Sequence, residues 1–171
     1  GYGGAIFNNG GTIVITGSDF SYNNATIAGS AIANDEGTVN ITTSNFTHNI
    51  AYSGGAIYNY ANGVVNIIYS KFINDTANNG NGGAIYNNAT MTINHTQLEY
   101  NNVIGGLGGA IYNLATLMIS NAALSYNNAS RGGAVYNNHA SMTMSDSILE
   151  NNTADNEGGA IYNENGIINI T

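Results

Sequence analysis

The sequence predicts an all-β fold: a right-handed single-stranded parallel β-helix of about seven coils, each with about 26 residues and three short strands. Three observations predict it. The motif GGAIYN, or a close variant, occurs seven times at steps of 24 to 28 residues. A second motif, an aromatic residue or Leu three positions before Asn or Asp, recurs at steps of 25 or 26 residues. Between the two, every repeat carries a pair of apolar residues two positions apart, which is strand alternation.

The GGAIYN motif is the first element of each repeat. Its first glycine is expected where a loop enters a strand, since glycine tolerates positive φ and close approach of other backbone. The Ile or Val is the best candidate for the inward position, although the unvarying Ala could face inward at a tight bend instead. The expected inward column is Ile6, Ile32, Ile57, Ile85, Ile111, Val135 and Ile161.

Counting by two from that column, the motif's Asn should also point inward. Each side-chain amide can then bond its equivalent one coil along while it satisfies the turn backbone. The expected ladder is Asn8, Asn34, Asn59, Asn87, Asn113, Asn137 and Asn163.

The apolar pair comes next, as in Val65/Ile67, and the second motif follows it, as in Phe46/Asn49. The second motif supplies another Asn corner, which is broken only by Asp75. Its spacing hardly drifts while that of GGAIYN does, so the insertions fall between them. Segments 75–81 and 101–107 are therefore expected to be loops on one side of the coil.

One repeat cannot bury its apolar face alone, whereas repeats stacked about 4.8 Å apart close a continuous core. We expect a right-handed coil from the handedness of parallel strand connections. Residues 1–171 are expected to be a single β-helix domain and a section of a longer repeat protein, because neither end carries a polar or helical cap.

The motif's aromatic position is expected to point outward. It would form a stripe along one side of the solenoid, able to contact sugar rings, a partner or another copy. The alternative, which we favour, is aromatic stacking between coils that stiffens the solenoid. The tyrosines of this column are Tyr58, Tyr86, Tyr112, Tyr136 and Tyr162.

Charge excludes several classes of partner. Charged residues make up 7% of the chain and its net charge is −8, so phosphate-rich nucleic acid and anionic membrane surfaces are unsuitable. The absence of a long apolar run predicts no membrane insertion by this segment. The three histidines occupy different places in their repeats, and the acids are scattered, although Asp155 and Glu157 fall in one loop and could contact a cation. Solvated loop acids are the favoured interpretation of this pair. We therefore expect no catalytic residue, cofactor or metal.

Nine Asn-x-Ser/Thr sequences occur in this Asn- and Thr-rich chain. N-glycosylation of a surface protein would be expected mainly at loop sites, and the candidates are Asn24, Asn74 and Asn128.

The alternation of GGA(I/V) with F-x-x-N over essentially the whole chain resembles the polymorphic outer-membrane protein family of surface autotransporters. The Asn-rich GGAIYN version resembles adhesin-like surface proteins of methanogenic archaea. Departures are GSAIAN at 29–34, Asp75, and Leu in place of Phe in the later repeats. The resemblance implies a right-handed β-helical passenger exported to the cell exterior, and its motif is structural, so it carries over no catalytic residue.

The function expected from these observations is a non-enzymatic extracellular rod of the adhesin-like type. Its partners would be glycans or proteins of a host or neighbouring cell. The alternative is a self-assembling filament, surface-layer or sheath subunit in which copies of the chain stack end to end. A polysaccharide lyase or hydrolase, which can share this architecture, is the least favoured of the three.

Overall fold

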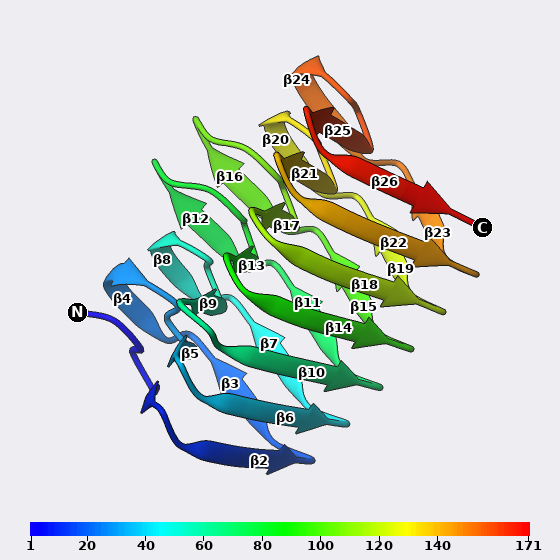
Figure 1. The fold of residues 1–171 in the computed structure, drawn as a ribbon. Helices are drawn as coiled ribbons and strands as arrows, with labels where there is room; N and C mark the ends of the chain where they lie inside the picture. The colour runs from blue at the N-terminus through cyan, green and yellow to red at the C-terminus, as the bar shows by residue number, and fades with distance from the viewer.

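The chain winds into a right-handed parallel β-helix without any helical segment, in a computed structural model that describes residues 1–171. Figure 1 shows the coils stacked along one axis, with the two termini at opposite ends. Each coil contributes strands to four parallel sheets, and we number these sheets by their order along a coil. No helix is present that is long and apolar enough to cross a membrane.

Two sheets have seven strands. The first sheet contains β1 (Ile6–Asn9), β5 (Ile32–Asp35), β9 (Ile57–Tyr60), β13 (Ile85–Asn87), β17 (Ile111–Asn113), β21 (Val135–Asn138) and β25 (Ile161–Glu164). The second sheet contains β2 (Thr12–Thr16), β6 (Thr38–Thr42), β10 (Val64–Ile68), β14 (Thr90–Asn94), β18 (Thr116–Ser120), β22 (Ser141–Ser145) and β26 (Ile167–Ile170).

The other two sheets have six strands. The third sheet contains β3 (Asp19–Ser21), β7 (Asn45–Thr47), β11 (Lys71–Ile73), β15 (Gln97–Glu99), β19 (Ala123–Ser125) and β23 (Ile148–Glu150). The fourth sheet contains β4 (Asn24–Ala28), β8 (Ile50–Ser53), β12 (Thr76–Asn78), β16 (Asn102–Ile104), β20 (Asn128–Arg131) and β24 (Thr153–Glu157).

Repeat-equivalent residues lie over one another throughout the stack. Ile85 pairs with Ile57 on one side and Ile111 on the other, and in the third sheet Phe72 pairs with Phe46 and Leu98. This register confirms the parallel β-helix and its repeat of about 26 residues. The chain makes about six turns rather than seven, because its seven GGAIYN copies bound only six complete repeats.

The expectation of three strands per coil was wrong, because the fourth sheet occupies part of the segments expected to be loops. The fourth strands carry Ala or Val at their inward position, and Ala77, Val103 and Ala129 form a small apolar cluster. Such segments lack the apolar alternation that marks a strand in the sequence. Stacking nevertheless pairs them in parallel, as in Ala77 with Val103.

Both the Ala and the Ile of GGAI belong to the core, which resolves the alternative left open by the sequence. Ala84 and Ile85 are both fully buried in the main apolar cluster. Their amides both donate to the Ala110 carbonyl, at 3.1 and 2.9 Å. Two donors on one acceptor are typical of a bulged backbone, and this bend turns consecutive side chains to the same side.

The two consecutive glycines of the motif are required for different reasons. Gly108 has a φ of +70°, and a Cβ there would lie 2.2 Å from the carbonyl oxygen of Ile111. Gly109 lies against backbone on two sides, since a Cβ would be 2.0 Å from the Gly133 oxygen and 2.7 Å from the Asn128 nitrogen. Backbone segments therefore lie in close contact between the fourth and first sheets, which explains why the inward residues there are small.

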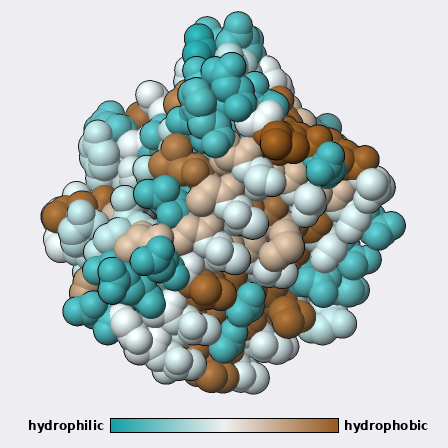
Figure 2. Space-filling model, viewed as in Figure 1, coloured by the Kyte–Doolittle hydropathy of each residue, from teal (hydrophilic) through white to brown (hydrophobic).

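The outward face of the second sheet is broad and uncharged. Its side chains are hydroxyl, amide or apolar, with none from Asp, Glu, Lys or Arg. This sheet lies toward the viewer in Figure 1, and Figure 2 shows pale colours with brown patches over much of the same face.

Candidate functional site

The Asn ladder of the first sheet runs through the stack as predicted. Asn87 Nδ2 donates to Asn113 Oδ1 at 2.8 Å, and Asn113 Nδ2 donates to Asn137 Oδ1 at 2.8 Å. Each amide also bonds the following turn, as in the 3.1 Å bond from Asn113 Nδ2 to the Ala115 carbonyl. The ladder joins every column member from Asn8 to Asn163, and Asn163, in the last coil, is exposed.

The predicted Ile column lies inside this frame. Its five middle members are fully buried, whereas the members in the first and last coils are partly exposed. The buried members are Ile32, Ile57, Ile85, Ile111 and Val135, and the flanking members are Ile6 and Ile161.

The tyrosine column points outward, and its rings stack on one another between coils. The ring centroids of Tyr58 and Tyr86 are 4.6 Å apart, and those of Tyr136 and Tyr162 are 4.9 Å apart. Tyr112 links the two pairs at 5.2 and 5.5 Å. Rings inside such a stack cover much of each other's faces, so they offer edges and hydroxyl groups rather than open faces.

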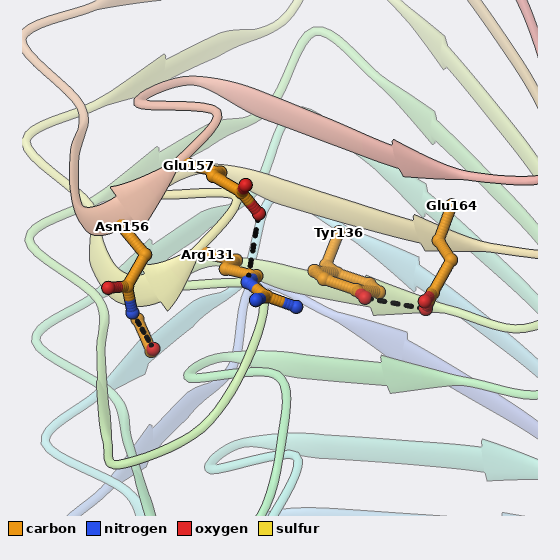
Figure 3. Close-up of polar contacts among 6 residues, drawn as sticks. Arg131, Tyr136, Asn156, Glu157 and Glu164 are labelled. Atoms are coloured by element: carbon orange, nitrogen blue, oxygen red, sulfur yellow. Dashed lines mark hydrogen bonds and ion pairs between the residues drawn. The ribbon is translucent and has the colours of Figure 1, made fainter.

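The C-terminal half of this column is covered by polar contacts, which Figure 3 shows. The Tyr136 hydroxyl donates to Glu164 at 2.6 Å, and Arg131 Nε lies 3.1 Å from Glu157 Oε2. The Arg131 guanidinium also lies 5.6 Å from the centre of the Tyr162 ring. Only 2% of the Tyr136 surface is exposed, so this half of the column offers little surface for binding.

The N-terminal half of the column borders an open groove of about 620 Å³. The groove runs along the axis between the first and fourth sheets, on the side where the coil length varies. Four of its lining residues are tyrosines: Tyr2, Tyr52, Tyr58 and Tyr86. The remaining lining side chains are aliphatic, amide or hydroxyl, and none of the lining residues is charged.

Tyr2 and Tyr52 lie outside the repeating tyrosine column, and Tyr2 stacks on Tyr60 with ring centroids 6.0 Å apart. Tyr52, on β8, is 52% exposed and forms no ring pair, so its aromatic face is free. Ala33 takes the place of an aromatic residue in the column, and Tyr2 lies near this gap with its ring 6.1 Å from that of Tyr58. Burial raises the pKa of the Tyr58 and Tyr86 hydroxyls above its usual value, so both stay neutral at physiological pH.

The groove's polar rim comes from residues 79–81 of the connection that joins β12 to β13. The backbone N–H of Asn81 donates to Ser53 Oγ at 3.2 Å, and Asn81 Oδ1 accepts from the backbone N–H of Leu107 at 3.0 Å. These bonds fix the rim and leave the Asn81 Nδ2 group to face solvent or a ligand. A rigid rim with free amide donors, beside a free aromatic face, suits a neutral polar ligand with apolar patches.

The other residues singled out from the sequence lie apart from this groove. His48, His95 and His139 are exposed, each with a positive φ in a turn. Asp155 and Glu157 lie on β24 rather than in a loop, and Glu157 is the partner of Arg131. No three His, Asp or Glu side chains are grouped so that they could hold a metal ion.

The three glycosylation candidates differ in their surroundings. Asn74 is exposed in a turn, whereas Asn24 and Asn128 are the first residues of strands β4 and β20 rather than loop residues. Asn128 is half-buried, and its Nδ2 donates to Asn102 Oδ1 at 3.1 Å. Asn24 and Asn74 therefore offer better access to a glycosylating enzyme than Asn128 does.

Sequence reasoning missed Tyr2, Tyr52 and the Asn79–Asn81 rim as parts of one site. They belong to no repeating column, and the fourth strands that place them were not predicted. One signal was present: the step of 28 residues between Ala56 and Ala84 is the longest in the series, and this insertion forms the rim.

Comparison with known proteins gives one family match. A sequence model of the Chlamydia polymorphic membrane protein repeat matches residues 43–60 and 146–164, together less than a quarter of the chain. Each matched segment holds one second-motif corner followed by GGAIYN, and in the structure the two segments form equivalent parts of different coils. Comparisons with curated proteins and with solved structures found no significant match. At these two segments the chain is similar to the polymorphic membrane protein repeat.

Proposed function

We propose that this chain is part of a non-enzymatic, adhesin-like protein of the cell exterior, and that it attaches to saccharides through the tyrosine-lined groove. The observation that carries the proposal is the groove's lining: four tyrosines and two asparagines, without any charge, on a frame fixed by stacked hydrogen bonds. The similarity of two segments to a membrane protein repeat supports a surface location. The resemblance of GGAIYN to adhesin-like archaeal proteins agrees with it.

The groove's chemistry favours a neutral saccharide over other ligands. A sugar ring has an apolar face that packs on an aromatic ring, and hydroxyl groups that pair with amides. Phosphate or sulfate groups would find no basic side chain in the groove and would meet the field of a chain with net charge −8. The free face of Tyr52 supplies the packing surface, and Asn81 supplies the donors.

Binding to an array of neutral and anionic oligosaccharides tests this function. We expect binding to neutral members and a loss of about twofold to twelvefold in affinity for Tyr52→Ala, since an aromatic contact contributes about 0.5–1.5 kcal/mol beyond its buried area. Tyr126→Ala is the matched control, because Tyr126 is similarly exposed but lies outside the groove. Equal binding by both variants and the unaltered chain would exclude the groove as the attachment site.

A further inference from the structure

A second column of asparagines closes the turn between the third and fourth sheets, and the asparagines inside the column share one set of bonds. Asn101 illustrates it: Oδ1 accepts from the backbone of the preceding coil, while Nδ2 donates to Asn127 Oδ1 at 3.0 Å and to the Phe72 carbonyl at 3.1 Å. Asn127 repeats the pattern with Asn152 Oδ1 at 3.0 Å and the Leu98 carbonyl at 2.9 Å. Each amide nitrogen therefore faces two acceptors.

Asp75 occupies this position in the third coil and is fully buried. Its Oδ1 accepts from the backbone N–H of Asn49 at 2.8 Å and from Asn49 Nδ2 at 2.9 Å, as the Oδ1 of an asparagine would. Its own amide donates to Asn101 Oδ1 at 3.0 Å. Asp75 Oδ2 is the one buried side-chain polar atom in the structure without a hydrogen-bond partner.

The column's symmetry explains why this oxygen has no partner. Asp75 Oδ2 stands where the other members place Nδ2, so it faces the equivalents of their two acceptors, Asn101 Oδ1 and the Phe46 carbonyl. A carboxylate has no proton to donate to either oxygen, and its charge repels both. A carboxylic acid has one O–H group, which donates to one of these acceptors and restores the column.

No basic group compensates a charge at this position. Lys71, on the preceding strand β11, is exposed and forms no ion pair. The turns stacked on either side bring His48, which is exposed, and Glu99 with Tyr100, which lie at the surface of the next coil. Burial raises the pKa of Asp75 to about 7, against the opposing effect of the bonds from the Asn49 backbone and side chain.

We propose that Asp75 is a proton-binding site within the solenoid, which donates a hydrogen bond along the asparagine column when protonated and breaks the column at the third coil when ionised. The proton links this coil to one of its two neighbours, so acid conditions tighten the stack and alkaline conditions loosen it there. The inference is independent of the saccharide groove.

The direction of the pH effect follows from the two states. In the unfolded chain an aspartate has its ordinary pKa of 3.8, whereas in the folded chain the value is about 7. The stability contributed by the proton is complete below the unfolded pKa. It declines as the pH rises between the two values, and it is lost once the pH has passed the folded pKa.

Thermal unfolding between pH 4 and pH 9 tests the proposal with two variants. Asp75→Asn restores the asparagine column and should raise the midpoint at pH 8 while removing the decline between pH 5 and pH 7. Asp155→Asn is the matched control, because Asp155 is exposed and forms no hydrogen bond, and it should keep the decline of the unaltered chain. A decline that persists in Asp75→Asn, or a lower midpoint for it at pH 8, would overturn the proposal.

A direct titration does not depend on how the variants fold. The side-chain carboxyl carbon of Asp75, followed by NMR in the unaltered chain, should titrate close to pH 7. A midpoint in the ordinary aspartate range near pH 4 would show that the site is ionised at neutral pH, and the proposal would fail.

Discussion

Asn113→Ala should destabilise the chain by about 2–4 kcal/mol, because Asn113 is a fully buried member of the first-sheet ladder. The substitution removes the 2.8 Å bond from Asn87 Nδ2, the 2.8 Å bond to Asn137 Oδ1 and the 3.1 Å bond to the Ala115 carbonyl. Asn87 Nδ2 keeps two other acceptors, at 3.1 and 3.0 Å. Asn137 Oδ1 loses its side-chain donor and stays buried.

The magnitude follows from these partners. A typical hydrogen bond contributes about 0.5–1.5 kcal/mol net, and a buried polar atom left without a partner costs about 1–3 kcal/mol. The assay is urea unfolding followed by circular dichroism, with Asn88→Ala as control, since Asn88 is exposed and its side chain forms no hydrogen bond. We expect less than about 0.5 kcal/mol for the control. If the two variants lost equal stability, the ladder would not be what stabilises the stack.

Three further changes probe other parts of the stack. Ile111→Asp should prevent folding or lower the unfolding midpoint severely, because it places a charge in a fully buried column; near-unaltered thermal unfolding would remove Ile111 from the interior. Gly109→Ala should destabilise more than Gly105→Ala, since a Cβ at Gly109 meets backbone atoms at 2.0 and 2.7 Å whereas one at Gly105 meets nothing within 4 Å and is opposed only by that residue's φ of +73°. Comparing their urea midpoints checks this, and an equal or larger loss for Gly105→Ala would contradict it. Phe72→Ala should cost about 3–5 kcal/mol in urea unfolding, because the ring is buried and stacks 4.5 Å from Phe46; a loss below 1 kcal/mol would contradict tight packing there.

Periodicity made the architecture predictable. In a stacked solenoid each residue's main neighbour is its own equivalent one repeat along, so a repeat length and a column of like residues specify contacts that other folds leave to tertiary structure. The Asn ladder followed for the same reason, as did the stacked tyrosines. The sequence left open whether Ile faces inward along a strand or Ala does so at a tight bend, and the bulged backbone at Ala84 and Ile85 buries both.

The parts that sequence reasoning missed are those without a repeat. The fourth strands pair through stacked backbone, although a segment such as Thr-Ala-Asp-Asn-Glu in β24 consists mostly of residues that are depleted in strands. The groove depends on Tyr52, Tyr2 and an insertion, each of which occurs in one coil only. Asp75 was visible as an exception in its column, but its burial and its unpartnered oxygen required coordinates.

The β-helix is short along its axis for the number of residues that it contains. Each turn uses about 26 residues to advance by one strand spacing of about 4.8 Å, whereas an extended chain covers about 3.3 Å with every residue. The polypeptide therefore gains little length and a large lateral surface, formed by the outward faces of its four sheets. Each added turn enlarges the outer surface of the solenoid, and the side chains presented on each sheet can be changed one coil at a time.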